Sequence, residues 1–278
     1  MSKYGCRLIA ALGSMLGLYA FATLPVVKLP DVRGTYEATV FVLSLPQSEV
    51  RALLPAGLEL GAQNSTGAEK HPVLVILGKQ KRVRNVVGRT TLPYEFNYTE
   101  TVLAVPYTRL SAGTLPRAKY RGPFYFMPKI FLDNRVPQFL GYAYGYNKVI
   151  AKLVADTGTY LISRGAQSLL NASFVSQAAF ASPERFPKYA EVERMMKQPI
   201  IGKRPDGFVC SAFDWNPENN LRIQPVSGTL QILVPLMNGS VGPLFYKSRS
   251  IKDARLGSFN VNSAWGLRGP FSCADLSR

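Results

Sequence analysis

The sequence predicts an α+β fold that is mainly antiparallel β-sheet with a few flanking helices. Short runs of β-branched and apolar residues recur along the chain, which is the pattern of strands. Glycine (23) and proline (20) are frequent, which indicates many turns. No linker rich in proline or serine divides residues 33–272, so we expect a single domain over that range.

The elements are expected in the following order. The apolar run 38–45 predicts a strand, and the Ser-Glu pair after Pro46 and Gln47 begins a short helix over 48–54. The best amphipathic helix covers 186–196. The other expected strands share the apolar or alternating pattern and cover 72–77, 97–106, 122–132, 159–163, 168–177, 207–213, 221–226, 229–236 and 258–264.

The first 22 residues have the pattern of a signal peptide. Lys3 and Arg7 form a basic region before an apolar run over 8–21, and Ala20-Phe21-Ala22 is a small-residue cleavage site. If it is not cleaved, the segment 8–27 is long enough to anchor the chain in a membrane. We therefore expect a protein that is secreted or resides in the lumen of the secretory pathway, with membrane anchoring as the alternative.

Two cysteines, Cys210 and Cys273, lie beyond that segment. In an oxidising compartment they could form one disulfide, and the sequence leaves open whether they lie close enough in space. Four Asn-x-Ser/Thr triplets are compatible with N-glycosylation of a eukaryotic secretory protein, at Asn64, Asn97, Asn171 and Asn238.

The ionisable residues exclude several classes of function. His71 is the only histidine and the chain has three cysteines, so a zinc site built from His and Cys is nearly excluded. Glycine-rich phosphate-binding motifs and a nucleophile elbow are absent from the sequence, and we expect no cofactor. The net charge of +16 is partly concentrated in 79–89 and 117–121. These side chains fit the solvent face of strands, and their charge would attract small anions more readily than nucleic acid.

Four pieces of the chain, in this order, resemble acetoacetate decarboxylase and its superfamily. Residues 49–60 (EVRALLPAGLEL) look like the family's early helix and its exit, and residues 98–106 (YTETVLAVP) look like its Tyr-x-Glu strand. Residues 131–148, which end in Gly-Tyr-Asn-Lys, are similar to the stretch that carries the family's Schiff-base lysine. Residues 256–265 are similar to its closing strand, so the resemblance spans residues 33–272.

The resemblance implies a sheet that closes into a barrel or cone, and a lyase that forms a Schiff base with a keto acid or related carbonyl compound. Lys148 matches the Schiff-base lysine, Glu100 matches an active-site carboxylate, and Arg33 matches an N-terminal arginine. Family members are often oligomers, so a homo-oligomer is compatible with it. The substrate pocket is expected to include aromatic side chains, namely Tyr98, Phe126, Tyr144 and Tyr146.

The chain departs from the family's pattern next to the lysine. Asn147 stands where the family has proline, and Val149 stands where it has a second lysine. A free lysine has a pKa near ~10.4 and is almost entirely protonated at neutral pH. Burial among apolar side chains disfavours the ammonium form, so a desolvated Lys148 could still supply a neutral amine for decarboxylation, aldol or dehydration chemistry.

Two other functions remain open. The same scaffold could hold a small ligand without turnover. Alternatively, a basic surface could bind anionic polymers or lipid headgroups. The enzyme requires Lys148 in a closed pocket near Glu100. The basic module requires one exposed face that carries Lys79, Lys81, Arg84, Arg117 and Arg121.

Overall fold

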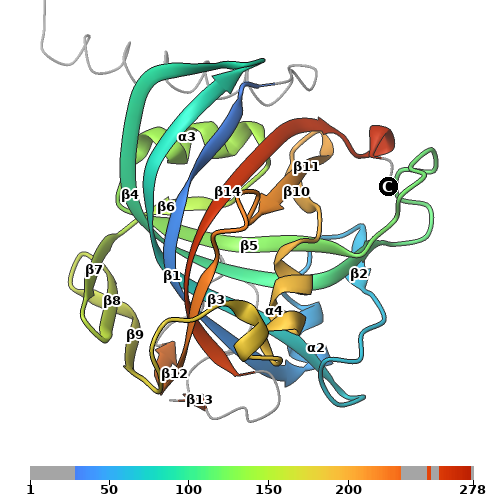
Figure 1. Ribbon diagram of the computed structural model, residues 1–278. Helices are drawn as coiled ribbons and strands as arrows, with labels where there is room; N and C mark the ends of the chain where they lie inside the picture. Colours follow the sequence, from blue (N-terminus) through green and yellow to red (C-terminus); the bar gives the residue numbers. More distant parts are fainter. Residues whose placement is uncertain (1–28, 233–248, 252–256, 277–278) are drawn as a thin grey trace, which may run out of the picture.

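The computed structural model describes residues 29–232, 249–251 and 257–276 (Figure 1). The expected signal peptide and Asn238 lie outside the described residues. The fold is mostly β-sheet with few helices, as predicted, and the strands belong to one 14-stranded sheet. Among the described residues, no helix is both long enough and apolar enough to cross a membrane.

A ring of hydrogen-bonded strands forms the centre of the molecule. Each strand pairs with the next, and the last pairs back to the first. The order around the ring is β1 (Asp31–Pro46), β3 (Lys70–Val87), β4 (Thr90–Leu110), β5 (Phe124–Leu132), β10 (Ile200–Arg204), β11 (Gly207–Trp215) and β14 (Ser258–Ser272). Neighbours in the ring are antiparallel except β5 and β10, which are parallel.

The remaining strands extend from this ring. β12 (Arg222–Ile232) pairs with β14 and leads outward to β9 (Gln167–Ser176), β8 (Thr159–Arg164) and β7 (Lys152–Asp156), which project at the lower left of Figure 1. Three short strands pair at the edges: β2 (Leu58–Leu60) with β4, β6 (Lys148–Ile150) with β5, and β13 (Arg249–Ile251) with β12.

Three α-helices are present among the described residues. α2 (Gln47–Arg51) follows β1 where the sequence predicts it, and α4 (Tyr189–Met196) is a shorter version of the helix expected over 186–196. α3 (Arg135–Ala143) is not expected from the apolar pattern. Its signal is Asn134, whose side chain caps the helix by accepting a hydrogen bond from the Val136 N–H. Two 3₁₀ turns complete the set, η1 (Pro183–Arg185) and η2 (Cys273–Asp275).

Most of the ring strands are longer than predicted, but β5 is two residues shorter and β10 is not expected from the sequence. β3 and β4 have 18 and 21 residues, whereas the apolar patterns predict only 72–77 and 97–106 within them. Beyond these stretches the outer face is exposed, so polar residues continue the strand on that side. Lys79 is exposed, for example, whereas its neighbour Gln80 is buried. The strand expected over 221–226 and the described part of the one expected over 229–236 form a single strand, β12, in which Gly228 lets the backbone approach Ser173 of β9 closely. Residues 233–236 lie outside the described residues.

The interior of the ring is filled by one cluster of buried side chains to which every ring strand contributes. Along β1 the contributors are Tyr36, Ala38, Val40 and Val42, at the spacing of two that places side chains on one face of a strand. α4 packs against the same cluster through its buried residues. The intervening residues of β1, such as Phe41, join a second cluster on the outer side, which packs against β8 and β9.

Candidate functional site

Lys148 is the first residue of β6 and follows a tight turn after α3. Gly145 has φ +68°, a conformation that favours glycine, and it reverses the chain between the helix and Asn147. β6 then pairs in parallel with β5, with Lys148 opposite Ile130. The lysine stem passes against α3, where a Cβ on Gly141 would lie 2.5 Å from the Lys148 Cδ. Gly141 therefore leaves the space that the lysine side chain occupies.

The Lys148 side chain lines a cavity of about 80 Å³ inside the ring. We call it the Lys148 cavity. Most of its wall is apolar and comes from the ring strands and α4. Its polar lining consists of Lys148, Glu100, Gln80, Trp265 and four tyrosines, Tyr36, Tyr98, Tyr125 and Tyr146.

Desolvation dominates the electrostatics of Lys148. Burial lowers the pKa of Lys148 below its ordinary value of 10.5, and the nearby Glu100 carboxylate opposes this effect. The Nζ atom lies 5.9 Å from the ring centroid of Tyr98 and 6.0 Å from that of Tyr146. The cavity therefore increases the fraction of the neutral amine, which is the nucleophilic form.

Glu100 is a buried carboxylate on β4, 5% exposed. The Gln80 side chain of β3 donates a hydrogen bond of 2.8 Å from Nε2 to Glu100 Oε1. Burial, and then the charge of Glu100, raises the pKa of Tyr36 and of Tyr98. These tyrosines consequently remain protonated and can donate hydrogen bonds.

Three buried polar atoms of the Lys148 cavity have no hydrogen-bond partner among the described residues. They are the Tyr36 hydroxyl, Gln80 Oε1 and Trp265 Nε1. Buried polar groups are normally paired, so these three side chains are candidates for contact with a ligand in the cavity. None of them is expected as a site residue from the sequence. The position of Gln80 in the strand could have indicated that it points inward. It lies an even number of residues after the interior residues Leu74 and Ile76, and such residues share one face of a strand.

The structure brings some of the predicted site residues together and separates others. Lys148, Glu100, Tyr98 and Tyr146 line one cavity. Tyr144 lies behind it, stacked on Tyr146 with ring centroids 5.4 Å apart.

The predicted pocket role of Phe126 and site role of Arg33 do not match their positions. Phe126 belongs to a different cluster, near Cys210, because it alternates with the inward-facing Tyr125 along β5. Arg33 is exposed on β1 and lines an outer cleft of about 550 Å³ with Arg82 and Arg84.

Solved structures with a similar fold are enzymes. The enduracididine biosynthesis enzyme MppR complexed with pyruvate matches with a TM-score of 0.58 and 14% identity, over 88% of this chain and 90% of that chain. MppR complexed with the condensation product of pyruvate and imidazole 4-carboxaldehyde matches with a TM-score of 0.58 and 14% identity, over 88% and 89%. An acetoacetate decarboxylase-like enzyme from Sphingomonas wittichii RW1 matches with a TM-score of 0.54 and 14% identity, over 88% and 92%.

The chain has the acetoacetate decarboxylase-like fold. The family resemblance of the sequence is thus confirmed at the level of the fold. No protein-family model and no curated protein sequence matches the chain.

Within this acetoacetate decarboxylase-like fold, the alternation of β6 decides which residue enters the ring. Lys148 lines the interior cavity, whereas Val149 packs against the outer cluster that contains Phe41. The position next to the lysine therefore faces away from the site, and a second lysine at Val149 would not point into this cavity. The departure from the family's Lys-Lys pair leaves Lys148 itself in place.

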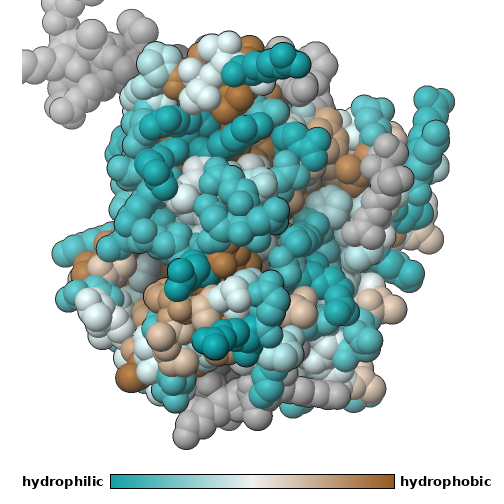
Figure 2. Space-filling model, in the orientation of Figure 1, coloured by the Kyte–Doolittle hydropathy of each residue, from teal (hydrophilic) through white to brown (hydrophobic). Residues whose placement is uncertain are grey.

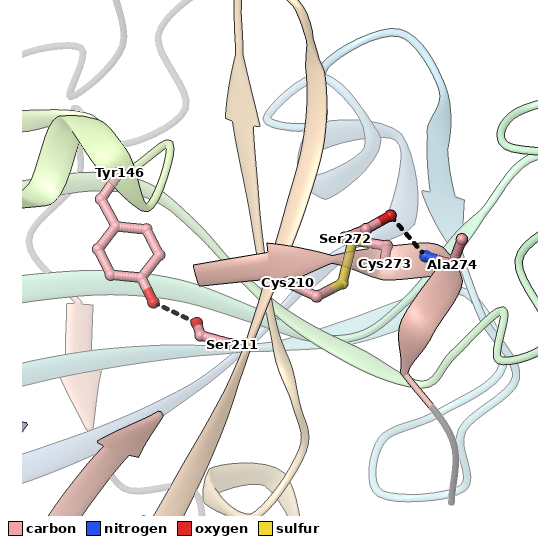
Figure 3. Close-up of a disulfide and its surroundings, with 6 residues drawn as sticks. All are labelled: Tyr146, Cys210, Ser211, Ser272, Cys273 and Ala274. Carbon is pink, nitrogen blue, oxygen red and sulfur yellow. Dashed lines mark hydrogen bonds between the residues drawn. A yellow bond between two sulfur atoms is a disulfide. The ribbon is translucent and has the colours of Figure 1, made fainter. Parts of the chain in front are cut away.

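The two cysteines form a disulfide between β11 and η2 (Figure 3). The residue after Cys210 is Ser211, whose hydroxyl shares a hydrogen bond of 2.7 Å with the Tyr146 hydroxyl. Cys210 and Ser211 are consecutive residues of β11, so their side chains lie on opposite faces of the strand. Cys210 fixes the C-terminal end of the chain, and Ser211 supports the wall of the Lys148 cavity.

The basic side chains are partly neutralised within the protein. Lys81 pairs with Glu37 at 2.6 Å, and Arg84 pairs with Glu95. Arg121 donates to backbone carbonyls of the preceding loop, including that of Ser111 at 2.6 Å. The face seen in Figure 2 is largely hydrophilic, with only small hydrophobic areas. In the part of the chain that the structure describes, no three His, Cys, Asp or Glu side chains are arranged to hold a metal ion.

Proposed function

We propose that this chain is a lyase-type enzyme that forms a Schiff base between Lys148 and a keto acid or a related small carbonyl compound. One observation carries the proposal: the Lys148 amine lines a small aromatic cavity that lowers its pKa, together with the buried carboxylate Glu100. The ring would then act as a barrel that holds the substrate inside. The similar fold of MppR, which is seen with pyruvate and with a pyruvate condensation product, supports this choice of substrate class.

The chemistry follows from a neutral amine next to a carboxylate. The Lys148 nitrogen adds to the carbonyl carbon, one proton is taken up, water leaves, and a positively charged iminium remains. A bond at the neighbouring carbon then breaks and its electron pair moves to the iminium, which gives an enamine and releases CO₂ from a β-keto acid, or a proton or a carbonyl fragment from another substrate. Protonation of the enamine and hydrolysis release the product and restore the amine. Glu100 is suited to accept and return the protons, while Tyr36 and Trp265 can donate hydrogen bonds to the substrate oxygen.

A binding protein without turnover is the second candidate. The unpartnered atoms of Tyr36, Gln80 and Trp265 favour it, because they could hold a small ligand without any reaction at Lys148. The two candidates differ in one property, which is whether a covalent bond forms at the lysine.

Reductive trapping separates these candidates. The protein is incubated with pyruvate, acetoacetate and simple ketones, then reduced with borohydride, and the modified lysine is located by peptide mass. We expect an adduct on Lys148 that is absent from Lys148→Met. Lys129 offers a matched control, because it is a buried lysine whose pKa is also lowered, first by burial and then by Arg164, but it is not part of the cavity lining.

The outcomes are distinct. An adduct on Lys148 that persists in Lys129→Met supports the enzyme. A folded protein that binds these compounds but gives no adduct on Lys148 would leave the binding protein.

We further propose that the chain works in the secretory pathway or outside the cell. The Cys210–Cys273 disulfide supports an oxidising compartment. Asn64, Asn97 and Asn171 are exposed and therefore accessible to glycosylation. Expression in a eukaryotic secretory host and digestion with an N-glycosidase should shift the mass of the protein, and deamidated peptides should map to these positions. An unglycosylated protein that remains in the cytosol would refute this proposal.

A further inference from the structure

We infer that the Lys148 cavity selects uncharged carbonyl compounds over keto acids. This inference rests on the proposed function and narrows its substrate class. It starts from the charges that line the cavity. Among the described lining residues, Lys148 is the only basic side chain and Glu100 is the only carboxylate. Arg33, which the resemblance matches to an N-terminal arginine, is not part of the lining: it is exposed on β1 and lines another cleft with Arg82 and Arg84, and this cleft shares only Trp265 with the cavity.

The charge balance during the reaction favours a neutral substrate. When the neutral amine of Lys148 condenses with a ketone or aldehyde, one proton is taken up and water leaves, so the iminium carries one positive charge, which Glu100 balances. A keto acid forms the same iminium but brings a second carboxylate into the cavity. One of the two carboxylates then has no counter-charge, and an unpaired charge in a buried site is costly.

The electrostatic potential in the cavity is already negative, like the charge of a carboxylate. After burial, the charges of Glu100 and Asp133 raise the pKa of Tyr98, followed by a contribution from Tyr146. After burial, the charge of Glu100 likewise raises the pKa of Tyr125. A substrate carboxylate would enter this negative potential, whereas an uncharged carbonyl compound would not be repelled by it.

The unpartnered polar atoms fit a neutral substrate that carries both kinds of hydrogen-bonding group. The Tyr36 hydroxyl and Trp265 Nε1 can donate to a carbonyl or hydroxyl oxygen. Gln80 Oε1 is an acceptor and needs a donor, which a carboxylate does not have. A small ketone or aldehyde with a neighbouring hydroxyl or amide group carries both a donor and acceptors for such atoms, whereas a keto acid offers no donor to Gln80.

Pyruvate and pyruvamide test the inference, because they have the same number of heavy atoms and differ in charge. The full chain is incubated with both at equal concentration in the presence of cyanoborohydride, which reduces the iminium to a stable secondary amine. The ratio of the two adducts on Lys148 is measured by peptide mass and divided by the ratio on free Nα-acetyl-lysine. We expect a corrected preference for pyruvamide of ~10-fold or more, since like charges in a desolvated site are strongly disfavoured.

Glu100→Gln supplies the second arm. The substitution removes the charge and keeps an oxygen for the Gln80 hydrogen bond, so we expect the preference to fall toward one. A corrected ratio near one, or in favour of pyruvate, in the wild-type protein overturns the inference while the adduct itself still supports a Schiff-base enzyme. The absence of any adduct on Lys148 overturns the inference and the proposed function together.

Discussion

At the scale of single residues, the lowered pKa that makes the Lys148 amine reactive is also expected to reduce the stability of the folded protein. Its pKa is lowered in the folded state, so the unfolded chain takes up a proton first as the pH falls below 10.5. The stability cost is therefore absent well above pH 10.5, grows as the pH falls through that value, and levels off below the folded pKa. Methionine has similar length and no charge, and it would pack against the same apolar wall.

We accordingly expect Lys148→Met to raise the free energy of unfolding at pH 7 by roughly 1 kcal/mol. This size is typical of stabilising substitutions, which often reduce activity when they replace an active-site residue. Urea unfolding at pH 7 and at pH 10.5 measures this, and the gain should shrink at the higher pH. A variant that is less stable than the wild type at pH 7 would show that the ammonium form is well accommodated.

The reactivity of Lys148 should depend on pH through the same group. Trapping by a neutral ketone should increase with pH, with a midpoint below 10.5, because only the neutral amine reacts. Glu100→Gln removes the charge that favours the ammonium form, so the midpoint should move to lower pH. The trapped fraction, measured by mass across the pH range, reports both midpoints. An unchanged midpoint in the variant would mean that Glu100 has no electrostatic influence on Lys148.

The sequence identifies only part of the site at this scale. Lys148 and Glu100 follow from the family resemblance, and the structure places both in one cavity. Gln80 and Trp265 are not expected, because ordinary polar and aromatic residues acquire their role only from the register of neighbouring strands. Phe126 is the opposite case: it is an expected pocket residue that the structure places elsewhere. Side chains alternate between the two faces of a strand, and this alternation directs Phe126 into a different cluster.

At the scale of elements, the fit between α3 and β6 positions the lysine. A methyl group on Gly141 would lie 2.5 Å from the Lys148 Cδ and 2.9 Å from its Cε, so the flexible stem has to move. Alanine is otherwise more favourable than glycine in a helix, by about 1 kcal/mol. The two effects act on different properties, namely the placement of the amine and the stability of α3.

We therefore expect Gly141→Ala to leave the melting temperature unchanged or higher, and to slow trapping at Lys148 by up to about 100-fold for a displacement on the order of 1 Å. Gly67→Ala is a matched control, because its methyl group would meet nothing within 4 Å. If trapping in Gly141→Ala equals that in Gly67→Ala, the position of the lysine stem does not limit the reaction.

The sequence locates the apolar part of most elements and misses their limits. The apolar pattern ends where a strand continues with one exposed face, which explains the extra length of β3 and β4. It also misses α3, because the capping residue Asn134, rather than an apolar stripe, marks where this short helix begins. Both errors arise because local patterns record burial, whereas strand ends and caps depend on hydrogen bonding.

At the scale of the whole molecule, closure of the ring creates the cavity. β1 and β14 pair over ten positions, from Val32 with Leu267 to Phe41 with Ser258. This contact joins the two ends of the described chain, and no local pattern predicts it; only the resemblance to a known family implies a closed sheet. The wall of the Lys148 cavity includes Tyr36 of β1 and Trp265 of β14, so the site exists only when these distant strands meet.

The disulfide should stabilise this closure by acting on the unfolded chain. It joins residues 63 positions apart, and a loop of that length corresponds to about 4 kcal/mol in the chain-entropy account, within the range of about 2–5 kcal/mol seen for native disulfides. Replacing both cysteines by alanine should lower the free energy of unfolding by that order, as measured by urea denaturation. Reductant should destabilise the wild type to a similar extent and leave the variant unaffected.

The disulfide constrains mainly the unfolded chain, so its loss should change the folded structure little. The folded variant should therefore still trap a ketone at Lys148, with Ser211 holding Tyr146 in place. Loss of trapping in a variant that remains folded would mean instead that the disulfide holds β11 in the geometry that the cavity needs.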